Sequence, residues 1–428
     1  MLLTALFLLL LLIALSLPIA AAIGVLGVIL DRTYGFLPLY QIAGEIAWTN
    51  SSGFLLMAIP LFVLLGEIML RSGIADAMYD ALAKWLGWLP GGVMHANVGA
   101  SALFAATSGS SVATAATIGT VALPQIERHG YGPRLFLGTL AAGGTLGILI
   151  PPSVNMIIYG ILTNSSVPQL YLAGIIPGLV LAVLFMIAIV AISLLNPAVA
   201  GRRVNYAWAE RLSGTLGIVP PIAIFVLVIG SIYGGIATPT EAAALGVMGA
   251  LTIAASRKRL NWRMLTEAVE GTVVTTAMIM MIIIAAYFLN SILAGIGLTN
   301  RLNEFVTDLG LSPIQMLLAV VVFYIVLGCF METLSMMITT IPIVAPLMFS
   351  LGFDPIWYGV LMMILIETAL ITPPIGLNLY VVQGVRGQGP MQDVMMGALP
   401  FVAVMAAMIV LLAVFPDLAT WLPNLLVD

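Results

Sequence analysis

The sequence predicts an all-α polytopic membrane protein with two inverted-topology repeats, each containing a re-entrant helical hairpin and a discontinuous helix. Three observations lead to this fold class: an extreme apolar composition, proline pairs inside apolar runs, and an internal register of prolines and glycines. Of the 428 residues, 62% are hydrophobic and only 7% are charged. A soluble domain carries about a quarter charged residues. The net charge of −4 argues against a nucleic-acid partner.

Nine apolar segments are long enough to cross a bilayer as helices, since a crossing needs about 20 residues. They are residues 2–30, 51–70, 135–162, 170–195, 214–235, 240–256, 266–290, 356–385 and 392–416. The first segment has no basic start, and its apolar run is longer than that of a cleaved leader. It is therefore expected to be the first crossing helix, and cleavage near residues 20–22 is the alternative.

Two further apolar stretches, 93–127 and 313–349, are interrupted near the middle by small or polar residues. Each half would form a helix of about 22 Å, which is shorter than a hydrocarbon core of about 30 Å. Both stretches are therefore expected to be hairpins that enter and leave the membrane on one side. An amphipathic segment precedes each hairpin, at residues 71–88 and 298–310, and is expected to lie in the membrane interface.

Basic residues indicate the orientation, because cytoplasmic loops are rich in Lys and Arg. With the N-terminus in the cytoplasm, nine crossings and two hairpins place every one of the 14 Lys and Arg residues inside except Arg32 and Arg301. The same count places the C-terminus in the periplasm.

A shift of 222 residues aligns the two halves of the chain. The aligned pairs are Pro124 with Pro346, Gly130 with Gly352, Pro133 with Pro355, Pro151–Pro152 with Pro373–Pro374 and, one residue further, Asn155 with Asn378. The turn at 127–134 is basic, whereas its mate at 350–355 has no basic residue, so the copies face opposite sides of the membrane. Inverted repeats with broken helices are typical of secondary transporters, whose site lies at the midplane between repeats.

Each proline pair should break its helix, because proline removes a backbone donor and clashes with the preceding turn. Unwound backbone at membrane depth is tolerated only where it lines a cavity or is buried in protein. There, free carbonyls and hydroxyls suit a hard cation, and the N-termini of half-helices suit an anion. Two pseudo-symmetric cation sites beside one anion site are therefore expected.

The hairpin tips supply the polar candidates. The first tip, 106–114, contains Ser108, Ser110, Ser111 and Thr114 and is expected to face the break at Gly147, Ile150 and Pro152; the second, 330–340, is expected to face Ala369, Thr372 and Pro374. Asn155 and Asn378 follow the breaks, and they either close the unwound turns or contact substrate. Small residues at helix crossings can also serve close packing alone.

Glu332 is a carboxylate expected at membrane depth, where insertion costs about 2.5–3.5 kcal/mol and a functional role is usual. It would bind a cation, carry a proton or contact substrate; the structural alternative is that it accepts hydrogen bonds from backbone donors at the tip. Glu367, just before the second proline pair, has the same alternatives.

Five stretches of the chain resemble the large membrane subunit of tripartite ATP-independent periplasmic (TRAP) transporters, the DctM-like family. They are AIPLFVLLGEIMLRSGIA (58–75), ATSGSSVATAATIGTVALPQI (106–126), GTLGILIPPSVNMIIYG (144–160), GGIATPTEAAALG (234–246) and TPPIGLNLYV (372–381). The resemblance implies an elevator fold of the ion-transporter superfamily and a sodium-coupled importer of carboxylates in the bacterial inner membrane. It also implies a periplasmic substrate-binding protein, a small four-helix membrane subunit, and no cofactor besides the coupling sodium ions.

The resemblance implies roles for individual residues. By analogy Ser108, Ser110, Gly147, Ile150 and Pro152 form a first sodium site, and Glu332, Thr333, Ala369, Thr372 and Pro374 form a second; Ser111, Thr114, Asn155, Ser335 and Asn378 are candidates for substrate binding. Residues 91–196 and 313–428 are expected to form two halves of a mobile transport domain, and residues 1–90 and 197–312 its scaffold.

Three other functions remain open. A self-sufficient sodium- or proton-coupled dicarboxylate or citrate carrier would need no binding protein. An intramembrane serine hydrolase would use Ser101 or Ser110 with His95 or His129, but the chain has no GxSG-type motif. A membrane subunit that serves only as scaffold would have no use for paired polar breaks. A transporter without enzymatic activity is therefore expected.

Overall fold

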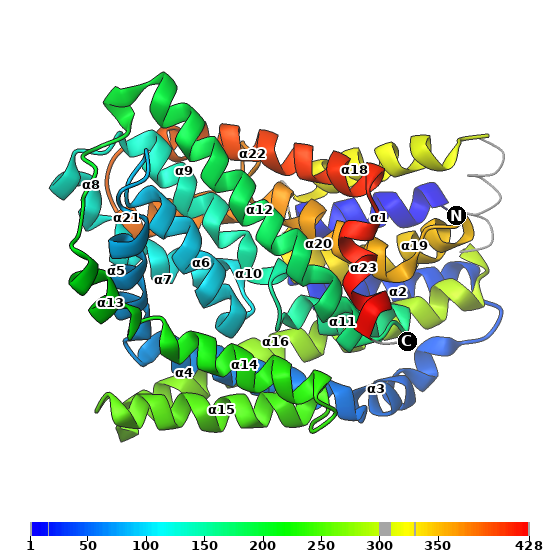
Figure 1. Cartoon of the computed structure of the whole chain (residues 1–428). Coiled ribbons are helices and arrows are strands. Elements are labelled where there is room, and N and C mark those ends of the chain that lie inside the picture. Colours follow the sequence, from blue (N-terminus) through cyan, green and yellow to red (C-terminus); the bar gives the residue numbers. More distant parts are fainter. Residues whose placement is uncertain (1, 16, 299–309, 329–330, 427–428) are drawn as a thin grey trace.

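The computed structural model describes the chain except residues 1, 16, 299–309, 329–330 and 427–428. The described residues form helices, and apart from an isolated bridge between Tyr131 and Ala200 they contain no β-structure. The helices lie side by side in a bundle, with α22 and α18 along one side and α14 and α15 along the opposite side (Figure 1). The predicted all-α membrane fold is confirmed.

The first apolar segment is a helical hairpin, so the prediction of one crossing helix over 2–30 is wrong. Helix α1 (Leu2–Ala14) and helix α2 (Ile19–Tyr34) run antiparallel, and the Thr4 hydroxyl lies 3.0 Å from the Tyr34 hydroxyl. Pro18 precedes α2 and disfavours helical conformation in the residue before it. The predicted side of the N-terminus depended on a single crossing here.

Two short helices follow, η1 (Leu39–Ile42) and α3 (Ala43–Ser51). The expected crossing 51–70 is formed by η2 (Phe54–Met57) and α4 (Ala58–Arg71), which together are long and apolar enough to cross a membrane. Helix α5 (Ile74–Leu86) comes next. Helix α5 is the expected amphipathic element; Ile74 and Met78 are buried, while Asp76 and Asp80 are exposed. Most of its expected mate, 298–310, lies outside the described residues.

Both expected hairpins are present. The first consists of α6 (Met94–Ser108) and α7 (Ser111–Ala122), and the second of α18 (Pro313–Gly328) and α19 (Thr333–Ser350). The arms of the second lie antiparallel, because the Tyr324 hydroxyl on α18 is 2.5 Å from the Thr340 hydroxyl on α19. Residues 329–330 at its tip are not described.

Both expected discontinuous helices are broken at the proline pairs. The first consists of α9 (Pro133–Gly144), α10 (Leu146–Leu149) and α11 (Val154–Thr163), and its two parts are bent by 44°. The second consists of α20 (Pro355–Ile371) and α21 (Leu377–Arg386). The Pro151–Pro152 and Pro373–Pro374 peptide bonds are both cis.

The remaining helices complete the bundle. They are α8 (Pro124–His129), α12 (Val167–Leu195), η3 (Pro197–Val199), α13 (Trp208–Thr215), α14 (Val219–Tyr233), α15 (Pro239–Ser256), α16 (Trp262–Gly295), α22 (Met391–Val414) and α23 (Asp417–Leu426). Within the described residues, five single helices are long and apolar enough to cross a membrane, or seven if two bent pairs count as spans. One of the five is α19, so this arm of the second hairpin is longer than the sequence predicts. The expected crossings 240–256 and 356–385 form α15 and α20–α21 but fall outside that set.

Packing between the two halves follows the 222-residue shift. Helix α7 of the first hairpin packs on α21, and its counterpart α19 packs on α11. In the same way α9 packs on α22 and α20 packs on α12. Each hairpin therefore contacts the broken helix of the opposite half as well as its own. A second group of helices, α2, α4, α14, α15 and α16, packs together beside them.

Candidate functional site

The first hairpin tip is closed by its own hydroxyl groups. Gly109 ends α6 with φ +59°, a conformation that favours glycine. Ser110 caps α7 by accepting a hydrogen bond from the Ala113 amide at 3.4 Å. The Thr114 hydroxyl donates to the Ser110 carbonyl (2.7 Å), so the Ser108 hydroxyl is the donor to Thr114 (3.0 Å). These oxygens keep lone pairs for a further ligand.

The backbone of this tip lies directly on the first helix break. A Cβ on Gly147 would lie 2.7 Å from the carbonyl carbon and oxygen of Ser110 and from the Ser111 nitrogen. A Cβ on Gly109 would lie 2.9 Å from the Pro152 carbonyl oxygen. The structure therefore brings together four of the five residues predicted for the first sodium site. The fifth, Ile150, is buried within the same break, between α10 and α11.

At the second tip, Glu332 caps α19. One carboxylate oxygen accepts from the Leu334 amide (3.1 Å) and the Thr333 hydroxyl (2.8 Å), and the other accepts from the Ser335 amide and hydroxyl (both 3.2 Å). In the 222-residue register Glu332 is the counterpart of Ser110, which caps α7. The structural alternative for Glu332 is therefore realised, and its role as a sodium ligand stays a prediction.

The second tip also meets its break, but the contact is more open. A Cβ on Gly328, at the end of α18, would fall 2.1 Å from the Ala369 Cβ, so the two backbones are in close contact. The Thr372 hydroxyl donates to the Thr368 carbonyl at 2.6 Å. Thr372 is half-buried and Pro374 is exposed, whereas Pro152 at the first break is buried. The two predicted sodium sites are thus related by the repeat but differ in solvent access.

Two of the substrate candidates are asparagines with unsatisfied amides. The Nδ2 atom of buried Asn155 has no hydrogen-bond partner. Asn378 is 0% exposed, and neither its Nδ2 nor its Oδ1 has a partner. Asn378 therefore does not close the unwound turn through a side-chain hydrogen bond. Of the other candidates, Thr114 and Ser335 bond to protein groups at the tips, and Ser111 bonds to Glu367 on α20.

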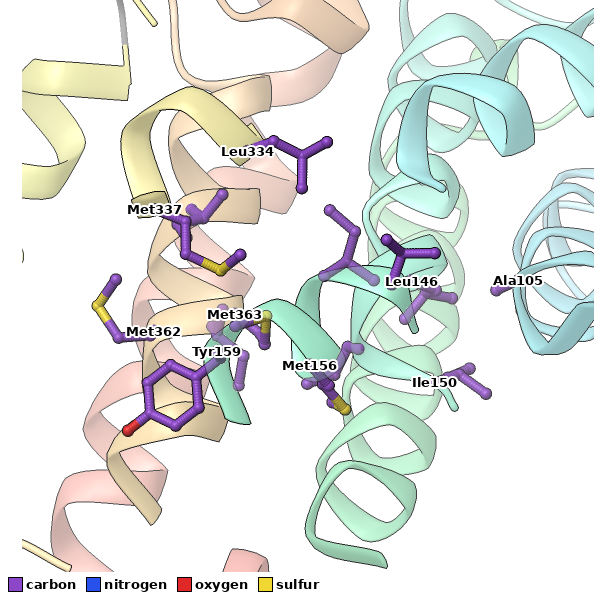
Figure 2. Close-up of a cluster of buried hydrophobic side chains, with 14 of the residues drawn as sticks. Ala105, Leu146, Ile150, Met156, Tyr159, Leu334, Met337, Met362 and Met363 are labelled. Atoms are coloured by element: carbon purple, nitrogen blue, oxygen red, sulfur yellow. The ribbon is translucent and has the colours of Figure 1, made fainter. Parts of the chain in front are cut away.

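An apolar cluster fills the space between the first break and the second hairpin. Figure 2 shows Leu146 and Met156, from α10 and α11, facing Leu334, Met337 and Met363 from α19 and α20. Methionine side chains are flexible and adapt to irregular gaps. This cluster therefore forms an apolar contact between the two halves of the chain.

A contact between the halves was not foreseen from the sequence. The Ser111 hydroxyl, on α7, donates a hydrogen bond to Oε1 of Glu367, on α20, 256 residues away. Both residues are buried. The sequence signal was a carboxylate inside an apolar run, but its partner could not be read from spacing. Gly144 beside Ser111 was also missed as a site residue.

The geometry gives no support to a serine hydrolase. Ser110 serves as a helix cap, and the ring of buried His95 bonds to the Pro90 carbonyl oxygen at 2.8 Å. Among the described residues, no hydrogen bond joins Ser101 or Ser110 to either histidine.

Comparison with known proteins is consistent with this architecture. The chain is 33% identical to the C4-dicarboxylate TRAP transporter large permease protein DctM of Vibrio cholerae over 96% of this chain and 94% of the relative. It is 31% identical to the sialic acid TRAP transporter large permease protein SiaM of Vibrio cholerae over 87% of each. It is also 31% identical to the 2,3-diketo-L-gulonate TRAP transporter large permease protein YiaN of Escherichia coli over 95% of each.

Its fold is similar to that of a solved transporter. The crystal structure of the Alcanivorax borkumensis YdaH transporter matches with a TM-score of 0.61 at 16% identity, over 93% of this chain and 97% of that chain. Residues 6–418 match the model of the tripartite ATP-independent periplasmic transporter, DctM component. The chain therefore belongs to the DctM family of large permease subunits of TRAP transporters.

Proposed function

We propose that the chain couples inward sodium movement to the import of a carboxylate. The observation that carries this proposal is that the first hairpin tip contacts Gly147 at its break, while the second hairpin contacts Ala369, the repeat counterpart of Gly147, at the end of α18. Hydroxyl and carbonyl oxygens at these tips suit a hard, weakly held cation. The N-terminus of α7 at the first tip suits a substrate carboxylate, whereas the Glu332 carboxylate already occupies the N-terminus of α19.

The substrate class and partners follow from the relatives. Three of their names specify C4-dicarboxylate, sialic acid and 2,3-diketo-L-gulonate, which are carboxylates at neutral pH, and a fourth specifies isethionate, which is a sulfonate. The isethionate TRAP transporter permease protein DctMQ of Oleidesulfovibrio alaskensis matches 93% of this chain over 62% of its own length, which leaves room for a fused second subunit. We therefore propose a separate small four-helix membrane subunit and a periplasmic binding protein as partners.

The proposed mechanism is an elevator movement in the bacterial inner membrane. The two hairpins and two broken helices form the moving unit, and the group around α4, α14, α15 and α16 forms the scaffold. Each net positive charge that moves inward across 100 mV contributes about 2.3 kcal/mol. The distribution of Lys and Arg predicts a periplasmic C-terminus. The predicted cytoplasmic N-terminus can be tested by labelling single cysteines on either side of the α1–α2 hairpin.

The test is uptake of labelled succinate, a C4-dicarboxylate, into proteoliposomes containing this chain and the small subunit encoded with it. The matching binding protein is supplied outside. Uptake that rises with an inward sodium gradient and requires the binding protein supports the proposal. Uptake of equal rate in choline refutes sodium coupling, and uptake without any binding protein identifies a self-sufficient carrier instead. Malate, fumarate and sialic acid extend the panel if succinate is not transported.

A further inference from the structure

We propose a third sodium site, separate from the two at the hairpin tips, between Glu367, Ser111 and Asn378 at the junction of the two repeats. The proposal rests on the sodium coupling proposed above and adds a charged site to it. Its ligands would be the carboxylate of Glu367, the hydroxyl of Ser111 and the amide oxygen of Asn378.

The first observation is an incompletely paired carboxylate inside the protein. Glu367 is 1% exposed; its Oε1 accepts the Ser111 hydroxyl, and its Oε2 has no hydrogen-bond partner. No Arg, Lys or His among the described residues forms an ion pair with it. A buried carboxyl group is tolerated when it is protonated or when a counter-charge accompanies its charged form.

The charged side chains on the helices that pack against α20 either have other partners or lie at helix ends. Arg386 on α21 pairs with Asp393 on α22 at 3.3 Å, and Asp417 begins α23. Glu332 is occupied as the cap of α19. No protein cation is therefore placed to neutralise Glu367 within the described part of the chain. One monovalent cation would balance its single negative charge, whereas a divalent ion would leave an excess.

The second observation is a buried asparagine with an unsatisfied amide group near the backbone of the same serine. Asn378 is fully buried, and its Oδ1 and Nδ2 have no partners. Its Nδ2 and the Ser111 carbonyl oxygen both lie 3.2 Å from the position that a Cβ on Gly144 would take. The glycine therefore leaves room for the asparagine head group beside Ser111. Because the Ser111 hydroxyl is the donor in its hydrogen bond to Glu367, the lone pairs of the Ser111 oxygen remain available to a cation.

The third observation is that the repeat does not require this carboxylate. In the 222-residue register the counterpart of Glu367 is Thr145, whose hydroxyl bonds to the Ala142 carbonyl of its own helix at 2.6 Å. The counterpart of Ser111 is Thr333, which bonds to the helix cap Glu332. An uncharged residue thus satisfies the equivalent position, so packing alone does not explain the acid on α20.

The test counts sodium ions by equilibrium binding of 22Na⁺ to the purified complex of large and small subunits in nanodiscs. Glu367→Gln keeps the shape and the bond to Ser111 but removes the charge, and it should lower saturating 22Na⁺ binding by one ion per large subunit. Ser111→Ala should weaken the affinity of one ion by about tenfold, as expected for losing one bond to a charged group. Thr117→Val is the matched control, because Thr117 is also buried on α7 with an unpartnered hydroxyl.

Each outcome of these binding measurements either supports or overturns the third sodium site. An unchanged sodium count and affinity in Glu367→Gln overturns the third site, and so does loss of all bound sodium, because the site would then not be separate. If Glu367→Gln fails to fold, unchanged affinity in Ser111→Ala overturns the proposal on its own. If the wild-type complex binds no 22Na⁺, the proposed sodium coupling fails, which distinguishes that failure from failure of the third site alone.

Discussion

Replacing Gly147 with alanine tests whether the contact between the first tip and its break forms a sodium site. The new Cβ would lie 2.7 Å from three backbone atoms of Ser110 and Ser111. Ordinary carbon contacts are about 3.5 Å or longer, so the tip must move by roughly 0.8 Å. Backbone cannot swing aside as the end of a flexible side chain can.

The size of the effect follows from the cost of overpacking, which is about 1–3 kcal/mol for an added carbon in a well-packed site. If the alanine displaces the tip from the break, sodium binding has to bring the two back into contact, and the free energy of sodium binding is weakened by this cost. A loss of that size lowers affinity about 5-fold to 150-fold. The half-saturating sodium concentration for succinate uptake in proteoliposomes should therefore rise by at least fivefold.

Gly119→Ala is the matched control. Gly119 is a buried glycine on the same hairpin, but a Cβ there would meet only the Val385 side chain at 3.6 Å, an ordinary contact. This variant should keep the wild-type sodium dependence. If folded Gly147→Ala transports with a sodium dependence equal to that of wild type, the tip and break do not bind the coupling ion.

Three further changes test single contacts. Glu332→Ser should keep the cap of α19 and the thermal stability, whereas Glu332→Ala should lower the free energy of unfolding by about 1 kcal/mol. A large loss of sodium affinity in the folded serine variant would show that the carboxylate does more than cap the helix. Thr238→Ala removes the cap of α15, whose hydroxyl oxygen accepts a hydrogen bond from the Glu241 amide at 3.4 Å. This variant should destabilise the protein by about 0.5–2 kcal/mol in thermal unfolding. No loss of stability would show that the cap is dispensable. Asp393→Asn removes the ion pairs with Arg134 (3.0 Å) and Arg386 (3.3 Å). Because partly exposed ion pairs contribute about 1 kcal/mol or less, the melting temperature should fall slightly, and it should fall less in high salt. A loss that does not depend on salt would argue against ion pairing.

The hairpins and broken helices could be predicted because local chemistry determines them. The proline pairs leave few backbone alternatives and appear in both halves of the sequence, and Gly109 marks the turn of the first tip. The first segment was misjudged for the opposite reason. Hydropathy is the same for one long helix and for two short helices in a hairpin, and Pro18 was the one local sign of the turn.

The composition of the candidate site was predictable, but its bonding was not. The repeat register placed tips opposite breaks, which the contacts at Gly147 and Gly328 now show in atomic detail. The partner of a buried side chain depends on how distant segments pack, so the bond between Ser111 and Glu367 could not be read from spacing. For Glu332 the sequence left a structural and a functional role open, and the structure shows the first.

The most direct test of sodium binding at the hairpin tips is a pair of high-resolution cryo-electron microscopy maps of the complex of large and small subunits, one in sodium and one in choline. We expect a density peak between residues 108–110 and the break at 147–152 in sodium, surrounded by hydroxyl and carbonyl oxygens, and its loss in choline. Two maps with the same backbone and no peak at this position would contradict it.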